Sequence, residues 1–203
     1  MPDWTIVVPV KGTASAKSRL GASPELALAI ALDTVESALA AASVLVVTSA
    51  GIVAQFEALG ARTIVDHDEG LGAAIARGIA SAGDGPVAVL LGDLPALRAA
   101  ELAAALELAG QHPLAFVPDA DNDGTVLITA LNAADHRPAF GERSRAAHLA
   151  AGYVELELPF DSGLRRDVDT SVQLAALGIR VGSRTRAALP WRGIAADSTL
   201  NWG

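Results

Sequence analysis

Two short acidic stretches, far apart in the chain, carry the side chains best suited to bind a divalent cation. Asp93 follows the apolar run VAVLLG in the segment GDLP, and Asp167 and Asp169 stand two residues apart in RRDVDT (165–170). Two residues with that spacing share one side of an extended segment. Carboxylate oxygens, together with substrate phosphates and water, are the ligands that Mg²⁺ takes in proteins. Asp93, Asp167 and Asp169 are therefore candidate Mg²⁺ ligands, and Asp93 and Asp167 are also candidate catalytic residues.

A third stretch supplies positive charge. The segment PVKGTASAKSRL (9–20) carries Lys11, Lys17 and Arg19 among small residues and follows an apolar run. Backbone N–H groups in such a loop can bind phosphate, and cationic side chains add charge-assisted hydrogen bonds. The segment matches neither the Walker A pattern nor GxGxxG. Combined with the acids, it suits attack on the α-phosphorus of a nucleoside triphosphate, whereas the alternative is a solvated basic loop.

Both acidic stretches also have a purely structural interpretation. Asp93 could cap a following helix that has Pro95 near its first turn, and Asp169 or Thr170 could cap a helix over residues 169–178. No serine or histidine is arranged as a nucleophile. The histidines lack metal-binding spacing, and we expect each to lie at the surface or to support a site indirectly: His67, His112, His136 and His148.

The elements that must position these residues alternate along the first half of the chain. Apolar runs predict strands, and helical periodicity with capping and glycine stop signals predicts helices between them. The strands are expected at 4–10, 43–49, 62–65 and 87–92, and the helices at 24–39, 51–60, 71–82 and 98–109. This alternation predicts right-handed βαβ crossovers and a mostly parallel sheet with helices on both faces. Ligands gather beyond the carboxyl ends of such strands, where Asp93 is expected.

The second half is less regular. Residues 114–119 and 125–131 are expected to pair through a longer turn, and 140–152 to form a loop and a short helix. Residues 153–159 are a further candidate strand and 169–178 a last helix. The Arg-rich part from Val181 is interpreted as an irregular extension.

Composition favours one compact α/β domain over residues 1–189, with 190–203 as a C-terminal extension of unknown role. Of the 203 residues, 51% are hydrophobic and only 4% aromatic, and cysteine is absent, which excludes disulfides and thiolate metal sites. The net charge of −8 disfavours nucleic-acid binding. Charged residues interrupt the long apolar segment 24–42, so we expect no membrane span and a cytoplasmic location. The oligomeric state is left open.

Five segments occur in an order that resembles the CofC/FbiD family, the guanylyltransferases of coenzyme F420 biosynthesis. They are IVVPVKGTASAKSRL, LLGDLPAL, DGTVLI, FGERSRAAHLAAG and GLRRDVDTSVQL, and the likeness spans about residues 4–187. The resemblance implies a nucleotidyltransferase fold of the glycosyltransferase-A type, which is Rossmann-like. It also implies Mg²⁺-dependent transfer of GMP from GTP to the phosphate of phosphoenolpyruvate, 2-phospho-L-lactate or 3-phosphoglycerate, with release of pyrophosphate.

The resemblance also implies roles for individual residues. Asp93 and Asp167 match the metal-binding acids, with Asp169 a possible third, and Lys17 matches a catalytic cation of the triphosphate loop. The acceptor-binding positions are Thr125, Gly141 and Ser144. The nucleotide-binding positions are Pro9, Val10, Lys11, Lys17, Arg19, Gly72 and Asp93.

One departure from the family pattern concerns the nucleotide. The family usually has GLN before the helix, whereas this chain has Gly70, Leu71 and Gly72, which removes an amide that could contact the base. Two alternatives stay open: a related nucleotidyltransferase such as a molybdenum-cofactor guanylyltransferase, and a nucleotide-binding module without catalysis. A glycine-rich, Arg-containing loop would favour the first, but this chain has PVKGTASAKSRL.

Overall fold

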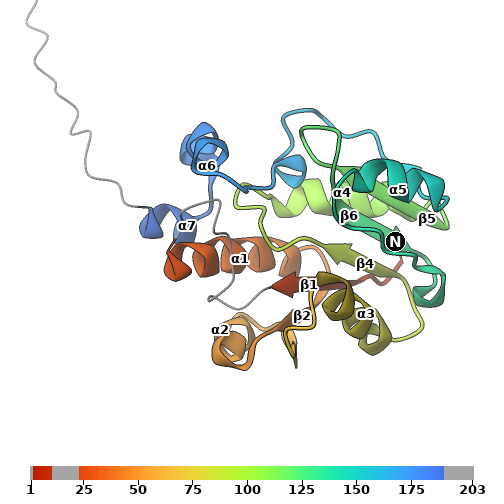
Figure 1. The fold of residues 1–203 in the computed structure, drawn as a ribbon, viewed down its shortest axis with the longest axis horizontal. Helices are drawn as coiled ribbons and strands as arrows, with labels where there is room; N and C mark the ends of the chain where they lie inside the picture. Colours follow the sequence, from red (N-terminus) through yellow and green to blue (C-terminus); the bar gives the residue numbers. More distant parts are fainter. Residues whose placement is uncertain (1, 11–22, 190–203) are drawn as a thin grey trace, which may run out of the picture.

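The computed structural model describes residues 2–10 and 23–189, which form a seven-stranded sheet covered by helices (Figure 1). The spatial order of the strands is β3-β2-β1-β4-β6-β5-β7. Their bounds are β1 Thr5–Val10, β2 Ser43–Thr48, β3 Arg62–Val65, β4 Val87–Leu90, β5 Leu114–Pro118, β6 Thr125–Ala130 and β7 Val154–Glu155. The α-helices of the described part are α1 Pro24–Leu39, α2 Val53–Glu57, α3 Leu71–Ala82, α4 Ala99–Ala109, α5 Ser144–Ala150, α6 Ser171–Leu177 and α7 Ser183–Ala188.

The core lies on both faces of the sheet because neighbouring residues of a strand point to opposite sides. In β1, Ile6 and Val8 belong to the apolar cluster that includes residues of α1, α2 and α4, whereas Val7 belongs to the cluster that includes α3. Gly78 of α3 lets this helix approach the sheet closely, since a Cβ at this position would collide with Val7. Burial on both faces explains the continuous apolar runs of the central strands.

One strand runs against the others, and its direction shapes the site. β6 pairs antiparallel with β4 and with β5, while β1 pairs parallel with β2 and β4, β2 with β3, and β5 with β7. The amino end of β6 therefore lies at the edge of the sheet where the other strands have their carboxyl ends. The backbone N–H of Leu91 donates to the carbonyl of Val126 at 3.0 Å, which holds the start of β6 beside the end of β4.

The predicted α/β class and the strands and helices of the first half are confirmed, and two predictions in the second half are wrong. The strand expected at 153–159 is limited to Val154–Glu155, and the chain leaves the sheet before Pro159, which has no N–H to donate. Residues 183–188, within the extension that was expected to be irregular, form α7. Figure 1 shows α7 beside α1, at the opposite end of the molecule from α5.

A buried carboxylate explains α7. Asp33 of α1 is 4% exposed, and its oxygens accept hydrogen bonds from the backbone N–H groups of Arg184 at 3.2 Å and Thr185 at 2.7 Å. Such bonds satisfy donors at a helix start that have no partner within the helix. Gly182 permits this approach, since a Cβ there would collide with the Asp33 carboxyl group. Asp33, some 150 positions away in the sequence, therefore stabilises the start of α7. The local sequence of α7 contains no signal that predicts this helix.

No helix among residues 2–10 and 23–189 combines the length and the hydrophobicity that crossing a bilayer requires. The predicted boundary at residue 189 stays a prediction, and the extension at 190–203 lies outside the described residues.

Candidate active site

The two acidic stretches meet at the carboxyl edge of the sheet. The carbonyl of Asp93, three residues beyond β4, accepts a hydrogen bond from the backbone N–H of Val168 at 3.1 Å. Val168 is fully buried, and its hydrogen bond fixes it beside Asp93. Asp167 and Asp169, which flank Val168, are therefore held close to Asp93. The structure thus brings together the three acids that the sequence suggested.

The structural interpretation of these stretches is wrong for Asp93 and correct for Thr170. α4 begins at Ala99 with Arg98 as its N-cap, so Asp93 is not the cap of this helix. The N-cap of α6 is Thr170, whose Oγ1 accepts from the N–H of Gln173 at 3.2 Å. Thr170 therefore caps α6, as one of the two candidates in this segment, and Asp169 is not the N-cap.

The acids influence one another strongly. Burial raises the pKa of Asp167 to about 7, with further contributions from the negative charges of Asp93, Asp119 and Asp169. Such a cluster is unfavourable when every member is ionised, and a bound cation would remove the repulsion. Excess negative charge at a partly buried site therefore fits a divalent cation.

A Mg²⁺ site needs fewer protein ligands than a closed metal centre. Within residues 2–10 and 23–189, no group of three or more His, Cys, Asp or Glu side chains is arranged to hold a metal ion. Mg²⁺ often binds one or two carboxylates and completes its shell with phosphate oxygens and water. Asp93 and Asp167 match that smaller protein contribution.

Asp119 is an acid that the sequence did not single out. Its carboxylate accepts from the backbone N–H groups of Asp123 at 3.1 Å and Gly124 at 2.8 Å, closing the turn that leads into β6. Arg165 holds the same turn from the other side, donating to the carbonyls of Pro118 and Asp119 and to Oδ1 of Asn122 at 3.3, 2.8 and 2.7 Å. The segment DADNDG is rich in turn-forming residues, which is the local signal that could have identified Asp119.

The elements that carry the three predicted acceptor-binding residues converge around one histidine. Thr125 is the first residue of β6 and is 3% exposed, and its Oγ1 lies 3.0 Å from Nδ1 of His148. Ser144 begins α5, which carries His148 one turn later, and its N–H donates to the carbonyl of Gly141 at 3.3 Å. Gly141 has a φ of 134°, which favours glycine at this turn.

His148 is buried, so a surface location is wrong for this histidine. Burial lowers its pKa to about 4. His136 is also partly buried, with Nδ1 3.1 Å from the Tyr153 hydroxyl and Nε2 3.0 Å from the carbonyl of Val87. No spacing rule identifies these histidines, because their partners come from other elements.

The described nucleotide-binding candidates lie at the same edge. Pro9 and Val10 are the last residues of β1, beside Gly92, at which an added Cβ would lie 3.3 Å from the carbonyl oxygen of Pro9. Gly72 is the second residue of α3 and is exposed. The remaining candidates lie outside the described residues: Lys11, Lys17 and Arg19.

Comparisons with known proteins show which family this chain resembles. The family described as "Guanylyl transferase CofC like" matches residues 4–181. The phosphoenolpyruvate guanylyltransferase of Streptomyces avermitilis is 49% identical over 201 residues, covering 91% of this chain and 93% of that protein. The protein of the same name from Salinispora arenicola is 48% identical over 199 residues, covering 92% of each chain.

Solved structures show the same fold at lower identity. A nucleotidyl transferase from Methanothermobacter thermautotroptrophicus superposes with a TM-score of 0.63 at 21% identity, covering 86% of this chain and 95% of that one. A cytidylyltransferase from Leptospira borgpetersenii gives 0.57 at 14% identity, covering 87% and 85%. With the family match over most of its length and relatives almost half identical, the chain belongs to the CofC-like guanylyl transferase family and is a nucleotidyltransferase.

Proposed function

We propose that this protein transfers GMP from GTP to the phosphate of phosphoenolpyruvate, releases pyrophosphate and requires Mg²⁺, as a step of coenzyme F420 biosynthesis. The relatives that are almost half identical are named for this acceptor and this reaction. The observation that carries the proposal is the meeting of Asp93 and Asp167 at the sheet edge where β6 begins with Thr125. 2-Phospho-L-lactate and 3-phosphoglycerate are the alternative acceptors.

The reaction balances without a protein base. A phosphate oxygen of the acceptor attacks the α-phosphorus of GTP, and the bond from that phosphorus to the oxygen bridging to the β-phosphate breaks. Pyrophosphate leaves with the electron pair, and the product is a diphosphate that joins GMP to the acceptor. Phosphate monoesters have a second pKa near 6, so the attacking oxygen is already ionised at neutral pH. The main requirement is alignment of two anions.

The carboxylates of Asp93 and Asp167 would hold Mg²⁺, with Asp169 as a third candidate. When bound, Mg²⁺ supplies positive charge to the α-phosphate and to the departing pyrophosphate. The protein itself holds the two acidic segments in a fixed relative position. The N–H of Val168, between Asp167 and Asp169, donates to the carbonyl of Asp93 at 3.1 Å.

The substrates would lie on two sides of these acids. Pro9, Val10 and Gly72 face the nucleotide in this proposal, and Lys17 neutralises charge on the triphosphate. Thr125, Gly141 and Ser144 bind the acceptor. The order β1-β4-β6 in the sheet supports this division, because β4 with Asp93 lies between the strands that carry Pro9 and Thr125.

The direct test is release of pyrophosphate from GTP with each of the three acceptors in parallel, with product masses measured. ATP and CTP serve as nucleotide controls. We expect release with GTP and phosphoenolpyruvate and a product of the corresponding mass. GTP binding without release under any condition would instead support a nucleotide-binding module without catalysis.

Substitution of the acids tests the site itself. We expect D93N and D167N each to lower kcat by at least about 100-fold in the presence of Mg²⁺, because charge stabilisation around the transferred phosphoryl group is lost. D84N is the matched control, since Asp84 is exposed on the loop before β4, at the other edge of the sheet. Folded D93N and D167N proteins with near wild-type turnover would overturn the assignment.

A further inference from the structure

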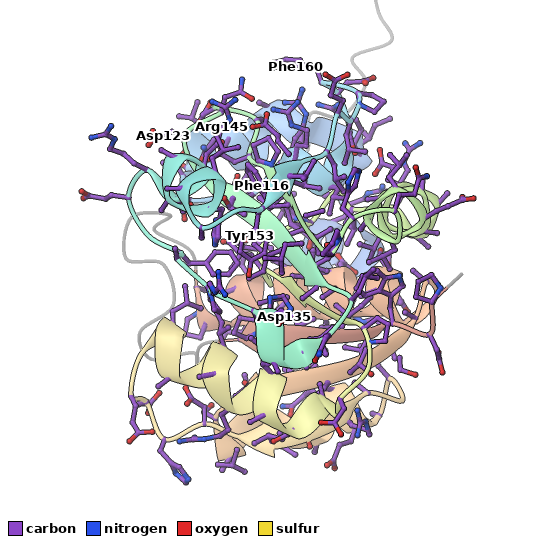
Figure 2. All side chains as sticks on the ribbon, turned by 90° about the vertical axis from the view of Figure 1, so that its right-hand side faces the viewer. Phe116, Asp123, Asp135, Arg145, Tyr153 and Phe160 are labelled. Carbon is purple, nitrogen blue, oxygen red and sulfur yellow. The ribbon has the colours of Figure 1, made fainter. Side chains whose placement is uncertain are left out.

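The ring of His148 is held in one orientation by aromatic neighbours. It is 0% exposed, and its centroid lies 6.0 Å from Phe116, 5.2 Å from Phe140 and 5.3 Å from Tyr153. Figure 2 shows Phe116 and Tyr153 between α5 and the strands. The contacts with Phe140 and Tyr153 are edge-to-face, a favourable arrangement for aromatic pairs. The two ring nitrogens therefore have fixed directions.

Hydrogen bonding determines which nitrogen carries the proton. The backbone N–H of Ala139 donates to Nε2 at 3.0 Å, so Nε2 must be an acceptor. Burial lowers the pKa of His148 to about 4, so the ring is neutral at pH 7 and its single proton is on Nδ1. Oγ1 of Thr125 lies 3.0 Å from Nδ1, and the ring also forms a hydrogen bond with the backbone of Ser144.

This tautomer sets the direction of the Thr125 hydroxyl. Because Nδ1 carries a proton, the threonine oxygen accepts from it and cannot donate to it. Among the described residues, Oγ1 makes no other hydrogen bond, so its own hydrogen is not committed to the ring and can turn toward another acceptor. An anionic oxygen is the strongest acceptor for such a donor.

We propose that His148 is a positioning residue for the acceptor: it fixes the Thr125 hydroxyl as a donor toward an anionic oxygen of the phosphorylated acid. The same ring holds the N–H of Ala139, two residues before Gly141, and lies one helical turn after Ser144. One side chain thereby ties together the three segments assigned to the acceptor. This inference rests on the proposed function for the assignment of Thr125.

Three substitutions separate the functions of the ring. H148F keeps the aromatic packing and loses both hydrogen bonds. H148Q can still accept a hydrogen bond from the N–H of Ala139. H148N places an amide N–H near the position of Nδ1, so it can still donate to Thr125. We expect the KM for phosphoenolpyruvate to rise at least about tenfold in H148F and H148Q, since a hydrogen bond to a charged group is weakened. H148N recovers most of this loss, and the KM for GTP is unchanged in all three.

A double-mutant cycle asks whether the effect passes through Thr125. T125V alone is expected to raise the KM for phosphoenolpyruvate, and H148F added to T125V raises it no further, because contacting residues that act as a unit are not additive. T129V is the matched control: Thr129 is a buried threonine of the same strand, and its hydroxyl donates to the carbonyl of Ala115. Its KM for phosphoenolpyruvate should equal that of the wild type.

Nitrogen NMR of the substrate-free protein gives a readout that needs no turnover. We expect the His148 ring, assigned by its absence from the H148N spectrum, to be neutral and protonated at Nδ1 at pH 7. A ring protonated at Nε2 would overturn the inference, and so would additive effects in the cycle, a wild-type KM in folded H148F, or an H148N variant as weak as H148F.

Failure of the proposed function would look different. A wild-type protein that releases no pyrophosphate with any acceptor contradicts the proposed reaction. The NMR result and the calorimetric affinity of phosphoenolpyruvate for wild type and H148F then decide the role of His148. A wild-type protein that turns over while H148F retains its KM contradicts only the present inference.

Discussion

At the scale of single residues, the negative charge of Asp167 is unfavourable in the folded protein. Its pKa of about 7, raised by burial and by neighbouring carboxylates, compares with an ordinary value of 3.8. Between these values the folded protein binds more protons than the unfolded chain, so stability falls as the pH rises. We predict that D167N is more stable than the wild type at pH 8 by about 1–2 kcal/mol, measured by urea unfolding without divalent cations.

The control for this prediction is the pH dependence of the stability difference between D167N and the wild type. The difference should shrink as the pH falls from 7 toward 4, because the folded protein already holds Asp167 protonated there and the unfolded chain begins to protonate it near its ordinary pKa of 3.8. Adding Mg²⁺ should raise the melting temperature of the wild type more than that of D167N, because a ligand stabilises the state that binds it. A D167N protein less stable than the wild type at pH 8 would show that the carboxylate is not strained by its neighbours.

At the scale of elements, the connection between β5 and β6 depends on Arg165. This residue is 8% exposed and donates to three oxygens of the 118–122 segment. We predict that R165M lowers the free energy of unfolding by about 2–4 kcal/mol, because it leaves buried acceptors without a donor. In the proposed function it should also raise the KM for the acceptor, since the turn leads directly into Thr125, the proposed acceptor-binding residue.

The matched comparison is R145M. Arg145 pairs with Glu155 at 2.8 Å, but both side chains are partly exposed, so the loss should stay below about 1 kcal/mol. Chemical denaturation measures both variants. Equal stability losses for R165M and R145M would mean that the buried hydrogen bonds do not support the turn.

At the scale of the whole molecule, two groups make stability depend on pH in opposite directions. Burial keeps the pKa of His148 near 4, below its ordinary 6.5, so the folded state binds fewer protons and loses stability as the pH falls through this range. Asp167 gains stability over the same range. We therefore predict that D167N loses stability between pH 6.5 and 4.5 more steeply than the wild type, and that adding H148F reduces this slope. An unchanged slope in the double variant, measured by denaturant unfolding, would contradict this account.

Much of this architecture follows from local sequence. The apolar runs at 43–49 and 87–92 predicted central strands, and Ser23 with Pro24 predicted the start of α1, where the Ser23 side chain accepts from Leu26. α7 could not be predicted in this way, because Asp33 caps it across 151 residues of sequence from Arg184. Local periodicity carries no information about a cap supplied by another helix.

The residues of the site also fall into two groups, those that local sequence predicts and those that it does not. The meeting of Asp93 with Asp167 and Asp169 was predictable, since the first follows a buried strand and the other two lie in a short extended segment. Asp119, Arg165 and His148 were missed because their importance lies in tertiary partners: a turn, three backbone or amide oxygens, and a threonine from another element. The roles of the individual acids and of Thr125 stay predictions.

The reversed direction of β6 divides the proposed substrate-binding residues along the chain. Since this strand begins where its neighbours end, one continuous stretch from β5 to β7 supplies Thr125, Gly141 and Ser144, whereas the proposed nucleotide side is drawn from the earlier crossover units. The segment from β5 to β7 could be exchanged by recombination as one continuous unit. Relatives could in this way diversify their choice of phosphorylated acid while the machinery that handles the nucleotide is inherited intact.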